Sequence, residues 1–94
     1  TRDELPDPQA LRVRTWVNDE SMQDAATSEM AFPVARLVAH LSQAISLRPG
    51  DIVSTGTPGG VGLFRKPPRF LAPGDVVRIR IDGIGELSNP VVAP

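Results

Sequence analysis

Hydrophobic and polar residues alternate with a period of two in two parts of the chain. In residues 11–17, apolar or threonine side chains alternate with arginines and a tryptophan, and residues 76–82 place valine and isoleucines opposite mostly arginines. This alternation predicts two β-strands, each with one face toward a core. Asn18 and Asp19 tolerate the backbone of a tight turn, so we expect the first strand to double back as a hairpin through residues 21–23.

A helical period follows at residues 34–45. Apolar side chains recur there at intervals of three and four, and the opposite side is polar and includes His40. Pro33 fits the first turn of such a helix, because the missing N–H of proline costs nothing there. We expect the helix to lie on the sheet through its apolar side and to end at residues 48–50.

The tripeptide Pro-Gly-Asp occurs twice, at residues 49–51 and 73–75, and a β-branched pair follows each time. Proline and glycine at the central positions favour a type II turn. The two turns therefore predict strands that begin at Ile52 and at Val76.

The remaining segments predict a surface loop and a last strand. Residues 65–70 are too rich in proline for a sheet or a helix and indicate a surface loop. The glycines of residues 83–85 turn the chain back into a final strand, and Pro90 indicates that this strand lies at a sheet edge. These elements together predict an α+β fold, mainly β, with one main helix.

Length and charge exclude several classes of protein. The 94 residues make one small domain at most, and 10 Lys and Arg against 11 Asp and Glu give a net charge of −1. This balance offers no field that gathers nucleic acid or an anionic membrane surface, so neither is an expected partner. The chain has no cysteine and no apolar run of membrane length, which is typical of a soluble, cytoplasmic protein.

Residues 55–62 are the most informative stretch, a loop of glycines and threonines that follows a short apolar run. Little side-chain bulk separates such a main chain from a ligand, so its N–H groups and hydroxyls can approach a carboxylate or a phosphate. Leu63 stands where a Walker loop needs lysine, and the glycine spacing of the dinucleotide fingerprint is absent. A plain Gly-Pro turn after a strand is the alternative interpretation.

Candidate catalytic and metal-binding groups are few. Zinc bound by cysteine and histidine is excluded, because the chain has no cysteine and His40 is its one histidine, with no orienting acid near it in sequence. The acidic residues occur as neighbours or in turns, so they are not expected to converge on a hard cation. We expect Asp51 and Asp75 to hydrogen-bond their own turns. No catalytic residue and no metal ligand is therefore assigned within the chain.

Four blocks of sequence, in a fixed order, connect these features. They are Trp16-Val17-Asn18 with Gln23, Thr27, Met30 and Phe32; Leu47 to Gly62 around Thr-Gly-Thr-Pro; Leu71 to Val77; and Gly83 to Val91. In order and spacing they resemble the C-terminal half of the fumarylacetoacetate hydrolase family, over nearly the whole chain. Residues 65–70 look most like the bacterial branch with 2-hydroxyhepta-2,4-diene-1,7-dioate isomerases and acylpyruvases.

The resemblance implies a layered, mixed β-sheet with few helices, usually dimeric, in which a carboxylate cluster holds Mg²⁺ or Mn²⁺ and chelates a 2-oxo or 2-hydroxy acid. The metal is expected to act as a Lewis acid on an enolate formed next to the ketone. By the same resemblance, Thr55, Gly56 and Thr57 bind the substrate carboxylate, and Gln23 supports the fold or a subunit contact. The implied partners are a small 2-oxo acid and a second copy, in a homodimer.

The family's Glu-x-Glu pair, metal-binding aspartate, active-site lysine and histidine-bearing lid all precede the segment that matches. We therefore expect residues 1–94 to be the C-terminal part of a single catalytic domain, with the Mg²⁺ or Mn²⁺ ligands in an upstream part. The reaction stays open among C–C bond hydrolysis, isomerisation and decarboxylation, because it depends on those upstream residues. The alternative is a truncated, non-catalytic structural or dimerisation module.

Overall fold

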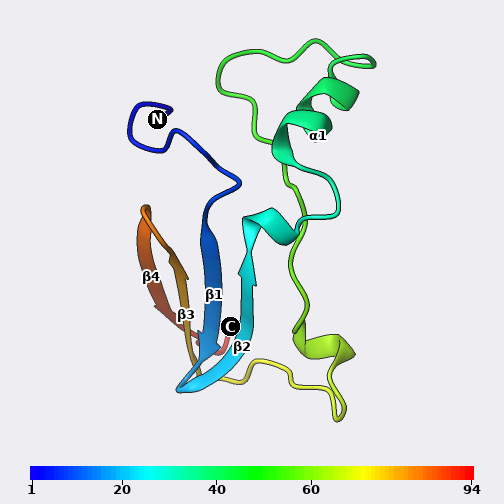
Figure 1. Ribbon diagram of the computed structural model, residues 1–94. Coiled ribbons are helices and arrows are strands. Elements are labelled where there is room, and N and C mark those ends of the chain that lie inside the picture. The colour runs from blue at the N-terminus through cyan, green and yellow to red at the C-terminus, as the bar shows by residue number, and fades with distance from the viewer.

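The computed structural model describes all 94 residues and contains one antiparallel β-sheet of four strands (Figure 1). The strands are β1 (Arg12–Val17), β2 (Glu20–Ala26), β3 (Val76–Ile81) and β4 (Gly85–Pro90), in the spatial order β2-β1-β3-β4. Both alternating regions form the predicted strands, and the α+β, mainly β class with one main helix is confirmed. β4 lies at a sheet edge, where its terminal proline is tolerated.

The β1–β2 hairpin turns at Asn18 and Asp19, as predicted. Asn18 has a φ of 56°, in the left-handed region that asparagine tolerates better than most residues. A bulge leaves Met22 without a direct partner, because Thr15 pairs with Gln23 while the next residue of β1 pairs with Ser21. Met22 and the last residue of β1 are the two buried residues of the chain.

Asp75 joins this hairpin turn to the second Pro-Gly-Asp turn. Its Oδ1 accepts a hydrogen bond from Asn18 Nδ2 at 2.9 Å, and its Oδ2 accepts from Ala72 N at 2.9 Å and Arg69 Nη2 at 3.1 Å. Asn18 Oδ1 in turn accepts from Val76 N at 2.9 Å. These donors, the Ala72 N–H first, lower the pKa of Asp75 below its ordinary value of 3.8. The expected role of Asp75 in its own turn is confirmed.

The first Pro-Gly-Asp turn has the same form but a different continuation. Gly50 has a φ of 95°, as type II geometry requires, and Asp51 Oδ2 accepts from Arg48 N at 2.7 Å, as expected. The predicted strand at Ile52 is wrong: residues 51–60 form no strand, and Ile52 is 93% exposed. The segment runs outside the sheet and makes no ladder with any of the four strands (Figure 1).

The helix α1 (Val34–Leu41) begins directly after Pro33, as predicted, but it ends earlier than the apolar spacing predicts. Ser42 donates its hydroxyl to Ala39 O at 2.8 Å, and the next N–H groups bond carbonyls three residues back, which tightens the last turn. The expected packing of the helix on the sheet is wrong. Residues 27–33 carry α1 beyond the end of β2 (Figure 1), and none of its residues is buried. With 8 residues, α1 is much shorter than a membrane-spanning helix, and the structure contains no other α-helix.

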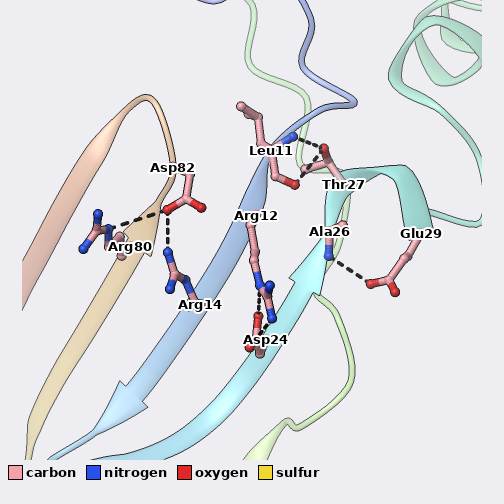
Figure 2. A network of polar contacts seen from close by, with 9 residues as sticks. All are labelled: Leu11, Arg12, Arg14, Asp24, Ala26, Thr27, Glu29, Arg80 and Asp82. Carbon is pink, nitrogen blue, oxygen red and sulfur yellow. Dashed lines mark hydrogen bonds and ion pairs between the residues drawn. The ribbon is translucent and has the colours of Figure 1, made fainter.

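One face of the sheet is covered by charged pairs (Figure 2). Arg12 donates to both carboxylate oxygens of Asp24, at 2.6 and 2.8 Å, and this pairing lowers the pKa of Asp24. Arg14 Nη2 donates to Asp82 Oδ1 at 2.5 Å, and its guanidinium lies 5.8 Å from the ring centroid of Trp16. Ion pairs therefore hold most of the charged side chains of this face, whereas Arg78 lies over the Trp16 ring, and the Nε atoms of Arg14 and Arg78 have no partner. The apolar strand positions occupy the other face.

Candidate substrate-binding site

A cleft of about 630 Å³ opens where the sheet meets the connection from β2 to α1. Its walls come from strand residues, from the β2–α1 connection with part of α1, and from the loop of small residues that follows the helix. The lining includes Val13, Ala25, Ile81, Thr27, Met30, Phe32, Leu37, Thr55, Gly56, Thr57, Pro58 and Gly59. The structure thus brings Thr55, Gly56 and Thr57 together on one wall of a cleft.

This wall carries hydrogen-bond donors that no protein group uses. None of the main-chain N–H groups of residues 52–60 donates a hydrogen bond within the protein. Gly56 has a φ of 93°, and nothing lies within 4 Å of the position that a Cβ would take, so a ligand can approach its main chain closely. Thr55 and Thr57 are exposed. Unused N–H and hydroxyl donors on one loop of small residues suit an anion.

Gln23 attaches the loop to the sheet. Its Nε2 donates to Thr57 Oγ1 at 2.9 Å and to Pro58 O at 2.8 Å. Gln23 pairs with Thr15 across β1 and β2, so both side chains leave the sheet on the same face. The Gln23 side chain, which leaves a paired strand, therefore holds the loop at a defined distance from this face of the sheet.

Gly60 and Arg65 hold the far end of the loop against the same strand. A Cβ at Gly60 would lie 2.0 Å from Met22 O, and the φ of Gly60 is +106°. The close contact with Met22 and the left-handed backbone conformation therefore both require glycine at this position. Arg65 donates from Nη2 to Met22 O at 2.7 Å and from Nε to Gly60 O at 3.2 Å. The loop is thus attached to β2 on both sides of Gly59.

The opposite wall is fixed by polar contacts of the 3₁₀ turn η1 (Thr27–Glu29), shown in Figure 2. Thr27 Oγ1 accepts from Leu11 N at 3.0 Å and donates to Leu11 O at 3.3 Å. Glu29 Oε2 accepts from Ala26 N at 2.9 Å. Gln9 adds a second support, because its Nε2 donates to Thr27 O at 2.7 Å. Both walls of the cleft are therefore held by hydrogen bonds to the strands or their ends.

The two sides of the cleft differ in polarity. The loop of residues 55–57 is polar, whereas most of the residues from the β2–α1 connection and α1, among them Met30, Phe32 and Leu37, are apolar, as are Val13 and Ile81 from the strands. Small-molecule sites combine an apolar lining with a few placed polar groups. The cleft accordingly suits a small ligand with an anionic group at one end and a carbon skeleton at the other.

The residues of this chain do not fit a divalent metal. No group of three or more His, Cys, Asp or Glu lies close enough together to hold an ion. Glu29 is the one acidic residue that lines the cleft, and one of its carboxylate oxygens is engaged by the Ala26 N–H. His40 lies exposed on α1. Mg²⁺ and Mn²⁺ prefer several oxygen ligands in a regular geometry, which this donor set does not supply.

The support of the loop is what sequence reasoning missed. The family resemblance implies that Gln23 supports either the fold or a subunit contact. The hydrogen bond from Gln23 to Thr57 agrees with the first of these two roles. A polar residue at an inward position of β2 is the signal that could have indicated it. Gly60 and Arg65 gave no such signal, because their partners on β2 lie about forty residues away in the chain.

The chain is similar to known enzymes over nearly its whole length. Oxaloacetate tautomerase fahd2, mitochondrial, of Xenopus laevis is 50% identical over 92 residues, which cover 98% of this chain and 29% of that protein. Maleylpyruvate hydrolase from Sphingobium sp. SYK-6, solved in complex with manganese(II) and pyruvate, matches with a TM-score of 0.84 and 40% identity, over 98% of this chain and 32% of that one. A 2-hydroxyhepta-2,4-diene-1,7-dioate isomerase from Mycobacterium marinum matches with a TM-score of 0.77 and 46% identity, and the match covers 92% of this chain and 31% of that one.

The chain spans about a third of the length of these relatives. They include a tautomerase, a hydrolase and an isomerase, and one of them is seen with a divalent metal ion. The family model for the fumarylacetoacetate (FAA) hydrolase C-terminal region matches residues 1–92. The resemblance read from the four sequence blocks is confirmed, and the chain belongs to the fumarylacetoacetate hydrolase family.

Proposed function

We propose that this chain is the carboxylate-binding part of an enzyme that acts on 2-oxo or 2-hydroxydienoic acids. Thr55, Gly56 and Thr57 bind the substrate carboxylate through main-chain N–H groups and hydroxyls. The observation that supports this most is the wall of unused donors at residues 55–57, which faces a cleft with an apolar far side. Hydrogen bonds from such donors to a charged acceptor are among the stronger ones in proteins.

The names of the relatives agree with this ligand class. The maleylpyruvate hydrolase was solved with pyruvate, a 2-oxo acid, and the tautomerase is named for oxaloacetate. In both molecules a carboxylate adjoins a ketone or its enol. The reaction itself, whether C–C bond hydrolysis, isomerisation or decarboxylation, is not decided by the loop, because all three need the same carboxylate to be held.

The proposal places the remaining machinery outside these 94 residues. The donor set here does not fit Mg²⁺ or Mn²⁺, whereas a relative is seen with manganese. We therefore propose that residues 1–94 form the C-terminal part of a single catalytic domain, and that a preceding part of the polypeptide provides the metal ligands and the acid–base groups. The contribution of this chain is to bind and orient the acid.

A structural or dimerisation module without catalysis is the second candidate. It is favoured by the small number of buried residues, Val17 and Met22, since a chain with so thin a core suits a part that completes another fold. The two candidates differ in one respect: only the first requires that residues 55–57 bind an acid.

The test compares two substitutions at Thr57 in the full-length protein that contains this chain. Thr57→Val removes the hydroxyl while keeping the shape, and Thr57→Ser keeps the hydroxyl. We expect Thr57→Val to weaken pyruvate binding by roughly tenfold or more, the loss of one hydrogen bond to a charged group, while Thr57→Ser stays close to the wild type. Calorimetric titration with pyruvate in the presence of Mn²⁺ measures both. Equal affinities in all three proteins contradict the proposal.

A further inference from the structure

We infer that Gln23 sets the direction of the Thr57 hydroxyl and thereby makes the loop select a carboxylate over a neutral carboxamide. The inference rests on the proposed function, because it concerns the same ligand group, and it assigns Gln23 a positioning role in specificity. Gln23 touches the loop and not the ligand, so its effect is transmitted through one hydrogen bond.

The orientation of the Gln23 amide follows from Pro58. A main-chain carbonyl oxygen only accepts hydrogen bonds, and Pro58 O lies 2.8 Å from the amide nitrogen of Gln23. The group that faces Pro58 must therefore be the donating NH₂ and not the carbonyl oxygen. The contact with Pro58 thus fixes which end of the amide meets the loop.

The direction of the Thr57 hydroxyl follows in turn. The same Nε2 lies 2.9 Å from Thr57 Oγ1, and because an amide NH₂ has no acceptor capacity, the hydroxyl oxygen must accept this bond. The hydroxyl hydrogen is then free to point elsewhere, and no protein acceptor takes it. Thr57 lines the cleft and is exposed, so its hydrogen is available to a ligand there.

The loop is held beside Gln23 by further contacts with the same strand. Gln23 lies on the paired strand β2, opposite Thr15. Gly60 packs its main chain against Met22 O, and Arg65 bonds the same carbonyl at 2.7 Å, so the loop is held on the strand beside Gln23. The amide and the hydroxyl therefore meet at a fixed separation.

Gln23 occupies one of the two lone pairs of Thr57 Oγ1, so the hydroxyl hydrogen points away from Gln23 and can be donated to a ligand in the cleft. Either oxygen of a carboxylate accepts that hydrogen, whereas the NH₂ end of a carboxamide requires the hydroxyl to turn its hydrogen away and to accept with its one remaining lone pair. Sites with fixed hydrogen-bond polarity reject mismatched groups more strongly than sites that differ in shape alone. Gln23 thus adds to the preference for the acid without contacting it.

The test measures the ratio of affinities for pyruvate and pyruvamide in the full-length protein, by calorimetry with Mn²⁺ present throughout. In Gln23→Glu the introduced carboxylate accepts the Thr57 hydrogen, so the hydroxyl turns a lone pair toward the ligand. We expect the ratio to fall at least tenfold, and because repulsion between the new charge and the carboxylate of pyruvate contributes to this fall, the uncharged variant Gln23→Ala decides the question. Gln23→Ala, which frees the hydroxyl to rotate, should lower the ratio by a smaller factor. Gln43→Glu makes the same chemical change at an exposed site beyond α1 and should leave it unchanged.

The outcomes separate this inference from the proposed function. If Gln23→Ala weakens pyruvate and pyruvamide equally, Gln23 is a structural support and the inference is overturned, while carboxylate binding by the loop stands. If the wild type binds the two ligands alike, or if Thr57→Val binds pyruvate as the wild type does, the proposed function itself fails. Should Gln23→Glu not fold, the ratio in Gln23→Ala still decides the question.

Discussion

Gly60 is the residue whose substitution the structure restricts most clearly. A Cβ there would lie 2.0 Å from Met22 O, and the φ of +106° is one that other residues adopt with strain. We expect Gly60→Ala to destabilise the protein by about 2 kcal/mol or more and to weaken pyruvate binding by displacing the loop. Gly59→Ala is the matched control, because nothing lies within 4 Å of its Cβ position. The thermal unfolding temperature and the affinity for pyruvate are measured for both variants. Equal losses in Gly60→Ala and Gly59→Ala would contradict the close approach of Gly60 to Met22 O.

At this scale the chemistry of the loop was predictable and its support was not. The small size and hydroxyls of Thr55, Gly56 and Thr57 are properties of the residues themselves, and the family resemblance placed them at a carboxylate. The hydrogen bond from Gln23 depends on the register of β1 against β2, which a one-residue slip would reverse. That register includes the bulge at Met22, which the alternation of residues does not indicate, and the partner of Gln23 lies 34 residues further along the chain.

The second Pro-Gly-Asp turn predicts a dependence of stability on pH. The pKa of Asp75 is lowered in the folded state by Ala72 N–H, then by Asn18 and Arg69. A carboxyl group with a lowered folded pKa stabilises the fold above its unfolded pKa, and this stabilisation is lost as the pH falls through the folded pKa. We therefore expect Asp75→Asn to lower stability at neutral pH and to remove part of the loss that the wild type shows below about pH 4.

Asp51→Asn is the control for this element, since Asp51 occupies the same position of the first turn but bonds only Arg48 N. Urea unfolding of the full-length protein, followed from neutral to acidic pH, gives the comparison. If Asp75→Asn and Asp51→Asn lose stability equally at neutral pH, the bridge from Asp75 to Asn18 does not stabilise the hairpin as inferred.

Elements were predictable where their own pattern determines them. The alternation of polar and apolar residues correctly predicted β1 and β3, and Asn18 correctly predicted the hairpin turn. Both signals lie within the segments whose structure they predict. The strand predicted at Ile52 and the packing of α1 on the sheet were wrong. Both depend on a partner surface, and a short apolar run pairs as a strand only where another strand offers an edge.

The whole molecule is more open than a self-sufficient domain. Its radius of gyration is 15.7 Å, whereas a compact chain of this length has about 12 Å. Two residues are buried, and Ile52, Phe64 and Val92 are more than three-quarters exposed. Exposed apolar surface on this scale is typical of a contact face, as the proposed larger catalytic domain requires, and the chain covers about a third of its relatives.

We accordingly expect the 94 residues alone to be weakly folded. Urea unfolding should be broad and should begin at low denaturant, and the chain should bind the dye ANS, as states with exposed apolar surface do. The full-length protein should unfold in a sharper transition without binding the dye. A sharp transition of the isolated chain with no dye binding would show that it needs no further polypeptide.

The most direct test of carboxylate binding by the loop is a titration of the isotope-labelled full-length protein with pyruvate, with Mg²⁺ in place of the paramagnetic Mn²⁺ here and in the matching calorimetry, followed by the amide NMR shifts. If residues 55–57 grip the acid, the N–H signals of Thr55, Gly56 and Thr57 shift most among those of this chain and saturate at the calorimetric affinity, and they shift far less with pyruvamide. Pyruvate that binds with the same affinity while these three signals stay in place would contradict the assignment of the loop.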